Sequence, residues 1–175
     1  ASASAASGIA LVEALGLLRA GQARLIAAGG GDALSAVSLR ARAADGTTAP
    51  AGEAAAILVL EREDTAASRG VEPLGKLLGC GLSVTLRAAA EAALAQAGLA
   101  SAALAAVYVN AAARSTAESL FAGATLIAPE ALCGDVQGAT TALHLAFALL
   151  ADHSGPVLVL TAEVHTCVAL VVTRA

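Results

Sequence analysis

Residues 4–9 read Ser-Ala-Ala-Ser-Gly-Ile and lead directly into an apolar helix. A corner of small residues at a helix N-terminus presents one side chain where free peptide N–H groups stabilise developing negative charge, which is the build of a nucleophile turn. The residue at its tip is Ala5, which can act neither as a nucleophile nor as an acid or base. The sequence therefore has the framework of a catalytic site without its reactive atom.

Two further pairs of reactive side chains stand close together in the sequence. His165 and Cys167 are two residues apart, so on a strand they would share one face, and a Cys/His nucleophile is one interpretation. No third group is present to orient them, which favours a turn histidine and a small buried thiol instead. Cys133 and Asp135 lie on either side of a glycine, but the local sequence offers too few ligands for a metal site. We therefore predict no metal and no cofactor.

The composition indicates a chain that another protein covers in part. Hydrophobic residues make up 58% of the 175 residues and charged residues only 14%, while aromatic residues contribute 2%. Little polar material remains for a free-standing surface, so we expect a substantial part of the exterior to lie against another chain. A net charge of -4 and scattered basic residues argue against a nucleic-acid partner.

The cysteines and the charge-free stretches bear on the compartment. Cys80, Cys133 and Cys167 are odd in number and widely spaced, which is typical of free thiols in a reducing compartment, so we expect a cytoplasmic protein. The longest charge-free stretch, residues 92–113, is interrupted by polar residues, and the next, residues 136–151, is short for a bilayer. We predict no membrane span.

Two apolar helices are expected to position the candidate site. Residues 8–20 place aliphatic side chains at helical spacing, and residues 134–150, opened by Gly134, do the same. Neither segment has a polar face, so both helices are expected to be buried on all sides. His144 lies in the second helix and is expected to be a hydrogen-bonded core residue. A corner of small residues precedes each helix, which hints at two related halves.

The segment after the first helix is expected to alternate strand and loop. Residues 23–28 predict a strand that runs into a tight turn at residues 29–31, which are all glycine. Residues 32–51, with Asp45-Gly46 as a turn, are the best candidate for a mobile loop. The uncharged apolar run 54–60 predicts a strand that is covered on both faces.

The remainder of the chain also alternates helices and strands. The expected segments are a polar helix at 62–69, strands at 74–79 and 107–110, helices at 86–97 and 115–122, an apolar segment at 125–127, and a terminal hairpin of strands at 157–161 and 168–173. This alternation predicts an α/β protein with a layered architecture.

Several of these stretches resemble the β-ketoacyl synthases of the thiolase-like superfamily, in the order that this family has them. Residues 4–9 resemble its nucleophile segment, and Asp45-Gly46 with residues 52–61 is similar to its DG and GEGAGVLVLE signature, with alanine at two of the glycines. Residues 108–111 resemble the segment before the first catalytic histidine, and residues 134–142 the helix that carries the second. The resemblance implies a thiolase-like fold layered α/β/α/β/α, incomplete relative to a full ketosynthase.

The same resemblance implies that all three catalytic positions are lost. The nucleophilic cysteine corresponds to Ala5, the first histidine to Ala112 and the second to Asp135. The family's reaction needs a thiolate to hold the acyl chain and two imidazoles to promote decarboxylation of the malonyl group. Two methyl groups and a carboxylate cannot supply these functions. The resemblance therefore implies a non-catalytic homologue without a catalytic residue of its own.

The family assigns such homologues the role of chain length factor, an inactive subunit that dimerises with an active ketosynthase. We therefore expect a heterodimer in fatty acid or polyketide biosynthesis, in which the active partner transfers the acyl group and this chain shapes the tunnel for the growing product. Contact with an acyl carrier protein is expected through the complex. We interpret residues 1–175 as one truncated ketosynthase-like domain, in which 1–80 are the remainder of the N-terminal half and 81–175 the C-terminal half.

Two alternatives stay open. One is an enzyme with a site rebuilt around Cys133, Cys167 or His165. The other is a structural or acyl-binding module that has no elongation partner.

Overall fold

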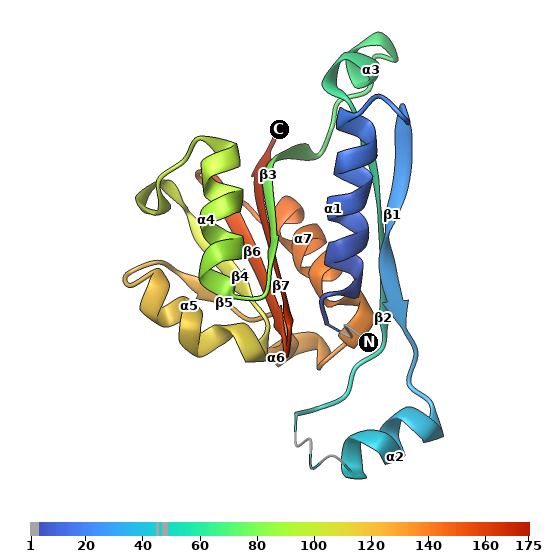
Figure 1. Ribbon diagram of the computed structural model, residues 1–175. Coiled ribbons are helices and arrows are strands. Elements are labelled where there is room, and N and C mark those ends of the chain that lie inside the picture. The colour runs from blue at the N-terminus through green and yellow to red at the C-terminus, as the bar shows by residue number, and fades with distance from the viewer. Residues whose placement is uncertain (1–3, 45, 47–48) are drawn as a thin grey trace.

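The structure is a computed structural model that describes residues 4–44, 46 and 49–175 (Figure 1). The described strands form a two-stranded antiparallel sheet, in the order β1-β2, and a five-stranded mixed sheet, in the order β3-β7-β6-β4-β5. The strands are β1 Leu25–Asp32, β2 Ala54–Glu61, β3 Gly75–Ser83, β4 Ala106–Val109, β5 Leu126–Ile127, β6 Val157–Glu163 and β7 Thr166–Arg174. The α-helices are α1 Ala6–Arg19, α2 Ala36–Ala44, α3 Glu63–Ser68, α4 Leu86–Ala97, α5 Arg114–Leu120, α6 Glu130–Cys133 and α7 Thr140–Leu150, and the 3-10 turns are η1 Ser101–Ala103, η2 Ala111–Ala113 and η3 Gln137–Ala139.

Helical layers and sheets alternate through the molecule (Figure 1). Helices α4 and α5 cover one face of the five-stranded sheet, and α1 and α7 lie between that sheet and the β1-β2 sheet. Strand β6 shows how both faces of the larger sheet are buried, because Leu158 and Leu160 pack in the cluster under α4 and α5 while Val157 and Val159 pack in the cluster with α1 and α7. The predicted α/β class and layered architecture are confirmed.

Several elements agree with the local sequence signals. Helix α4 begins after Thr85, whose Oγ1 accepts a hydrogen bond from the Ala88 N–H at 3.3 Å, and it ends at Gly98 in the left-handed conformation. The terminal hairpin pairs β6 with β7 from Val157 opposite Val172 to Glu163 opposite Thr166. Caps and β-branched runs are local features, so the sequence was sufficient to place these elements.

The three consecutive glycines do not form the predicted turn. Strand β1 runs through residues 29–31 and stays paired with β2. A Cβ atom on Gly29 would lie 2.0 Å from the carbonyl oxygen of Ala56, and one on Gly30 would lie 2.3 Å from that of Gly138. The glycines therefore allow the backbones of β1, β2 and η3 to approach closely, rather than reversing the chain.

The predicted loop at residues 32–51 contains helix α2. The helix starts with two serines that cap each other: the Ser35 N–H donates to Ser38 Oγ at 2.9 Å, and the Ser38 N–H donates to Ser35 Oγ at 3.0 Å. This exchange satisfies N–H groups that a helix start leaves free. Asp45 lies outside the described residues, so the expected Asp45-Gly46 turn is described only at Gly46, which has a φ of +69°.

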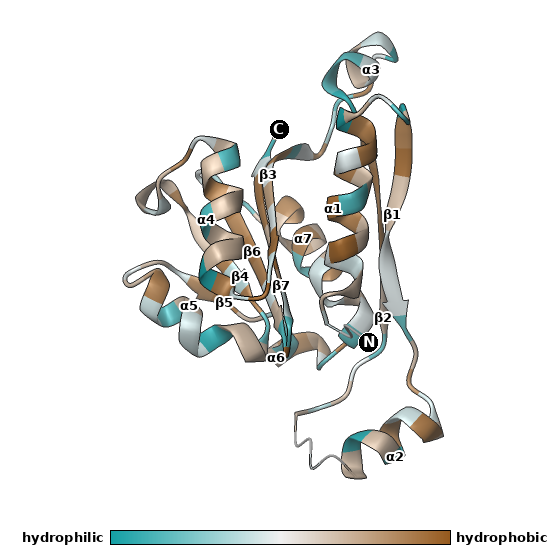
Figure 2. Ribbon diagram, viewed as in Figure 1, coloured by the Kyte–Doolittle hydropathy of each residue, from teal (hydrophilic) through white to brown (hydrophobic). Residues whose placement is uncertain are grey.

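Burial on all sides, predicted for the first helix and for the strand at 54–60, is wrong for both. Helix α1 buries one side, including Leu11, but leaves Leu17 42% exposed. Strand β2 is covered on alternate residues only, so that Ile57 and Val59 are 64% and 63% exposed. Figure 2 shows the hydrophobic residues along α1 and the first part of β1 on this side of the molecule. An apolar run indicates a strand, but it does not show whether a further layer covers that strand.

The second apolar helix starts later than predicted. Gly134 has a φ of +74° and ends α6, and η3 then leads into α7, which begins at Thr140. The three cysteines are free thiols. Within the part of the chain that the structure describes, no helix has the length and hydropathy needed to cross a membrane.

Candidate functional site

Helix α1 starts at the corner of small residues, as predicted. Ala5 is the N-cap, with φ −90° and ψ −8°, and its carbonyl accepts the Ile9 N–H at 2.9 Å. The side chain of Ala5 is fully buried and packs in the cluster that α1 shares with α7. The position at the tip of the turn is therefore occupied by a methyl group in the core.

Hydrogen bonds fasten this corner to the end of β6 and the start of α7. The Ser4 N–H donates to Glu163 Oε2 at 2.9 Å. Thr141 Oγ1 lies 3.2 Å from the Ser4 carbonyl oxygen and 3.0 Å from Thr161 Oγ1. Because a hydroxyl has a single proton, Thr141 donates to the Ser4 carbonyl and accepts from Thr161. Thr141 and Glu163 thus hold the corner in place, across sequence separations of 137 and 159 residues.

The carboxyl end of β4 is tied to the same end of β6. Asn110 is buried, its Nδ2 donates to the Ala162 carbonyl at 2.9 Å, and its Oδ1 accepts the Ala162 N–H at 3.0 Å and the Ala113 N–H at 3.2 Å. Strands β4 and β6 are parallel neighbours, so this amide closes the ladder where the strands end. Such an edge is where parallel α/β sheets present their site residues.

Ala112 lies in the turn η2 that follows, and it is exposed. Its neighbour Ala111 donates its N–H to Glu130 Oε2 at 2.8 Å, which connects η2 to α6. Burial raises the pKa of Glu130; the Ala111 N–H opposes the shift, and the negative charge of Asp135 adds to it. The turn that holds Ala112 therefore lies beside a carboxyl group, that of Glu130.

Asp135 serves as a structural anchor. Its Oδ2 lies 2.7 Å from Arg42 Nη1, and its Oδ1 accepts the Gln137 N–H at 3.0 Å. Its backbone accepts the Gly52 N–H at 3.0 Å and donates to the Pro50 carbonyl at 2.8 Å. Arg42 is only 9% exposed and reaches this site from α2. The position therefore holds a partly buried ion pair that ties α2 and the loop before β2 to the segment between α6 and η3.

The structure connects the three positions through their neighbours. The residue before Ala5 is held by Glu163, and Asn110, two residues before Ala112, is held by the adjacent Ala162. Asp135 follows α6, whose Glu130 binds Ala111. The side chains at the three positions themselves are two methyl groups and a carboxylate that is ion-paired with Arg42.

The histidine and the thiols of the other predicted pairs differ in burial. His165 is exposed in the turn between β6 and β7, whereas Cys167 is 5% exposed in the core under α4. Cys133 Sγ lies 3.3 Å from the Pro129 carbonyl oxygen, to which it donates. Burial raises the pKa of both thiols, which keeps them protonated at neutral pH. No group of three potential metal ligands occurs among the described residues.

His144 is buried in α7 but lacks the hydrogen bond expected for it. Within the described residues neither ring nitrogen has a partner, and Thr140 Oγ1, one helical turn earlier, also has none. Burial lowers the pKa of His144 to about 4, so the ring is neutral at pH 7. The histidine lies in the core as expected, but the expected hydrogen bond is wrong, because neither ring nitrogen has a partner within the described residues.

Sequence reasoning missed the side chains that hold the corner together. Glu163, Thr141 and Arg42 act over separations of 159, 137 and 93 residues, and no local pattern reports contacts of that kind. Asn110 had one usable signal, since a polar side chain that directly follows a buried strand often ends the ladder.

Comparisons with known proteins add the fold. No family model matches the sequence, and no curated protein matches it. A β-ketoacyl synthase from Burkholderia phymatum is 20% identical with a TM-score of 0.83, and the match covers 100% of this chain and 60% of that one. The ishigamide ketosynthase/chain length factor is 19% identical with a TM-score of 0.86, and the match covers 99% and 60%. A ketosynthase in complex with its chain length factor, from Xenorhabdus doucetiae, is 18% identical with a TM-score of 0.83, and the match covers 99% and 59%.

At these identities the likeness establishes the fold, which is that of the ketosynthases. The predicted thiolase-like architecture is confirmed. The chain spans about 60% of the length of the solved structures that it matches, so the predicted incompleteness of the fold relative to those proteins is confirmed as well.

Proposed function

We propose that this chain is a non-catalytic ketosynthase-like subunit, of the chain-length-factor type, that pairs with an active β-ketoacyl synthase in fatty acid or polyketide biosynthesis. The observation that carries the proposal is Ala5: a fully buried methyl group stands at the N-cap of α1, the position at which the resemblance places the nucleophilic cysteine. The solved structures with this fold include a ketosynthase bound to its chain length factor.

The carboxyl groups at or next to the three positions support a non-catalytic role. Condensation passes through an enolate, which positive charge or hydrogen-bond donors must stabilise. Here Glu163 and Glu130 are carboxyl groups that already accept backbone N–H bonds, and Asp135 is committed to Arg42. Acyl transfer and malonyl decarboxylation would therefore depend on the cysteine and histidines of the partner.

Pairing is the part of the proposal that the surface supports. The exposed apolar residues of β2 and the low content of charged residues are suited to a chain that a second subunit covers. We propose that the whole of 1–175 acts as one such truncated domain, with 1–80 and 81–175 as its two halves. Its site of action is proposed to be the cytoplasm, where free thiols persist, and an acyl carrier protein would reach it through the complex.

Co-expression tests the pairing directly. The chain is produced with the ketosynthase encoded beside it that retains the cysteine and both histidines, and the mass of the purified species is measured by light scattering. We expect one copy of each subunit, with elongation of malonyl thioesters only by the complex. Replacing the partner's nucleophilic cysteine by alanine is the control, and it should abolish all elongation. A stable monomer that does not bind the ketosynthase would refute the proposal.

The rebuilt-site alternative has its own test. A thiol-reactive acyl analogue is incubated with the chain at neutral pH, and the modified residue is identified by mass spectrometry. We expect no selective acylation of Cys133 or Cys167, because burial raises the pKa of both thiols. Rapid acylation of either residue relative to Cys80 would support an enzyme instead.

A further inference from the structure

The contacts that join helix α2 to the rest of the molecule centre on one side chain. Of residues 36–44, only Arg42 is buried. Arg42 Nη1 lies 2.7 Å from Asp135 Oδ2, and Arg42 Nη2 donates to the Ala49 carbonyl at 3.0 Å. Among the described residues, the other side-chain hydrogen bonds of this helix stay at its own start. Figure 1 shows α2 at the far end of the connection from β1 to β2, apart from the two sheets.

Gln137 completes the polar group around Arg42. With its amide oriented so that both ends are paired, Gln137 accepts a hydrogen bond from Arg42 Nη1 at 3.1 Å and donates to Asp32 Oδ2 at 3.2 Å. Its backbone N–H donates to Asp135 Oδ1 at 3.0 Å. The φ of Gln137 is +39°, in the left-handed region that residues with a Cβ atom seldom adopt. A strained backbone of this kind persists where its surroundings hold it, so these four side chains form one connected group.

The chain that returns from α2 to β2 is attached independently of Arg42. The Gly52 N–H donates to the Asp135 carbonyl at 3.0 Å, and the Asp135 N–H donates to the Pro50 carbonyl at 2.8 Å. A Cβ atom on Gly52 would collide with the Cys133 carbonyl oxygen, so this stretch lies directly against the segment between α6 and η3. These backbone contacts do not need the guanidinium group. Helix α2 can therefore move away while the return stretch stays in place.

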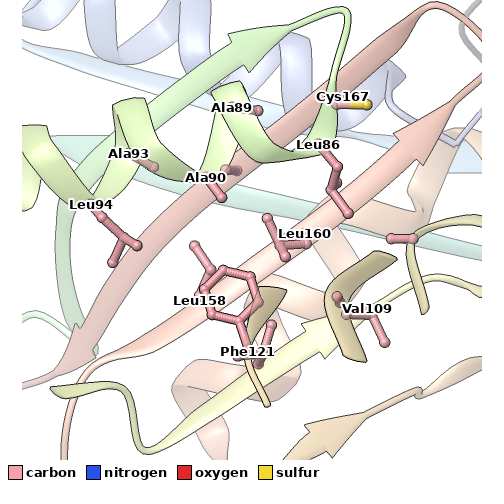
Figure 3. Packing of buried hydrophobic residues seen from close by; sticks show 14 of the residues in the cluster. Leu86, Ala89, Ala90, Ala93, Leu94, Val109, Phe121, Leu158, Leu160 and Cys167 are labelled. Carbon is pink, nitrogen blue, oxygen red and sulfur yellow. The ribbon is translucent and has the colours of Figure 1, made fainter. Parts of the chain in front are cut away.

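Helix α4 is attached in the opposite way. Its side chains Ala89, Ala90, Ala93 and Leu94 are buried over the larger sheet (Figure 3). Releasing a helix of this kind exposes a whole apolar face to water, which costs a large part of the stability of the domain. Helix α2 buries one side chain, and that side chain is charged. Its attachment therefore depends on an ion pair rather than on a packed face.

We propose that α2 is a strap, that the ion pair between Arg42 and Asp135 latches it onto the segment between α6 and η3, and that it opens while both sheets stay folded. Segments with few buried apolar contacts open at the lowest cost in free energy in a folded protein. The strap is closed in this structure, with Arg42 9% exposed. The proposal rests on the contacts of Arg42 and not on the exposed face of α2, and it does not depend on the loss of catalysis at Ala5.

Opening of the strap changes the charge at Asp135. In the closed strap the guanidinium group of Arg42 compensates this carboxylate. In the open strap Asp135 keeps the Gln137 N–H and loses its counter-ion. The pKa of Glu130, which is raised by burial and further by the charge of Asp135, shows that the two carboxyl groups sense each other. Opening therefore makes the segment that precedes α7 more negative, so α2 acts as an electrostatic switch for this edge of the molecule.

Hydrogen exchange followed by mass spectrometry tests the strap in the 175-residue chain at pH 7. In the unmodified chain we expect the amides of residues 36–44 to exchange more slowly than an unstructured peptide and faster than those of residues 86–97. Asp135→Asn removes the charge that holds Arg42 and should accelerate exchange of residues 36–44 about tenfold or more, with residues 86–97 unchanged. Asp64→Asn removes an exposed ion pair and is the matched control, which should leave α2 unchanged.

A second variant removes the other partner of the latch. Arg42→Gln should accelerate exchange of residues 36–44 as Asp135→Asn does, and the double variant should exchange no faster than the faster single variant, because both changes remove the same contact. Unchanged exchange of residues 36–44 in both single variants overturns the proposal. Equal acceleration of residues 86–97 also overturns it, because the ion pair would then stabilise the whole fold. In the unmodified chain, exchange of residues 36–44 at the rate of an unstructured peptide, or as slowly as residues 86–97, overturns it without any variant.

Discussion

The hairpins β1-β2 and β6-β7 follow helices that begin in the same way, yet β6-β7 is buried on both faces and β1-β2 on one. The strand sequences do not reveal the difference, since Ala54–Glu61 and Val157–Glu163 are both apolar runs that end in glutamate. What differs is the presence of α4, α5 and β4 over the second hairpin. The stability that a side chain contributes is therefore decided by neighbouring layers rather than by its own strand.

The largest expected effect contrasts one residue from each hairpin. Leu160 in β6 is fully buried and Ile57 in β2 is 64% exposed. We expect Leu160→Ala to lower the free energy of unfolding by about 2–5 kcal/mol, because it leaves a cavity between two packed layers. Ile57→Ala should cost about 0.5 kcal/mol or less in the chain alone. Urea unfolding followed by circular dichroism measures both, and equal losses would mean that β2 is covered in solution.

The second contrast concerns His144, which has no counterpart in α1, where the residue five positions after the N-cap is Ala10. The pKa of His144 falls to about 4 in the folded chain, below its unfolded value near 6.5. Between these pH values the unfolded chain binds more protons than the folded chain. The contribution of neutral His144 to the free energy of unfolding is therefore fully present above about pH 6.5 and is lost as the pH falls towards 4. The loss amounts to about 3 kcal/mol.

Unfolding free energies measured from pH 7 to pH 4 test this expectation. His144→Leu removes the titration and leaves no unsatisfied ring nitrogen, so its profile should lack this component and its stability at pH 7 should not fall. His165→Gln changes an exposed histidine and is the control. An unchanged pH profile in His144→Leu would contradict the assignment of this titration to His144.

The third contrast uses two glycines of α1, one that faces α7 and β7 and one that faces away from them. A Cβ atom on Gly8 would lie 2.8 Å from Thr141 Oγ1 and 2.9 Å from Val168 Cγ1, whereas one on Gly16 would have no neighbour within 4 Å. We expect Gly8→Ala to destabilise by about 1–3 kcal/mol through overpacking. Gly16→Ala should stabilise by about 0.5–1 kcal/mol because alanine favours the helix. Thermal unfolding distinguishes them, and a stabilised Gly8→Ala variant would refute close contact between the helices.

Local signals were sufficient for most of the fold. The cap and glycine around 86–97, the β-branched runs of the terminal hairpin and the apolar run at 54–60 each encode one element, and the structure has an element at each. Two of the errors have a common cause. The glycines at 29–31 permit close packing, and the exposed residues of β2 lack a covering layer, and both depend on segments remote in sequence.

The candidate site was predictable only in part, for the same reason. The corner at Ala5 is local, so the sequence placed it correctly at a helix start. The bonds from Glu163 to Ser4 and from Asp135 to Arg42 join residues 159 and 93 positions apart, and no spacing rule reports them. The sequence identifies the groups that the site lacks, and the structure identifies the contacts that now occupy it.

The smallest expected effect concerns the two helix starts themselves. Ala5→Cys and the matched control Ala139→Cys each place a thiol at a buried N-cap, and each should cost about 1 kcal/mol through overpacking. We expect neither variant alone to elongate a malonyl thioester above background, as measured by mass spectrometry of the product. A thiol at Ala5 would find only the methyl of Ala112 and the carboxylate of Asp135, which is held by Arg42, at the other two positions. Elongation by Ala5→Cys but not by Ala139→Cys would show that the corner at the start of α1 can still support catalysis, and would refute a non-catalytic role.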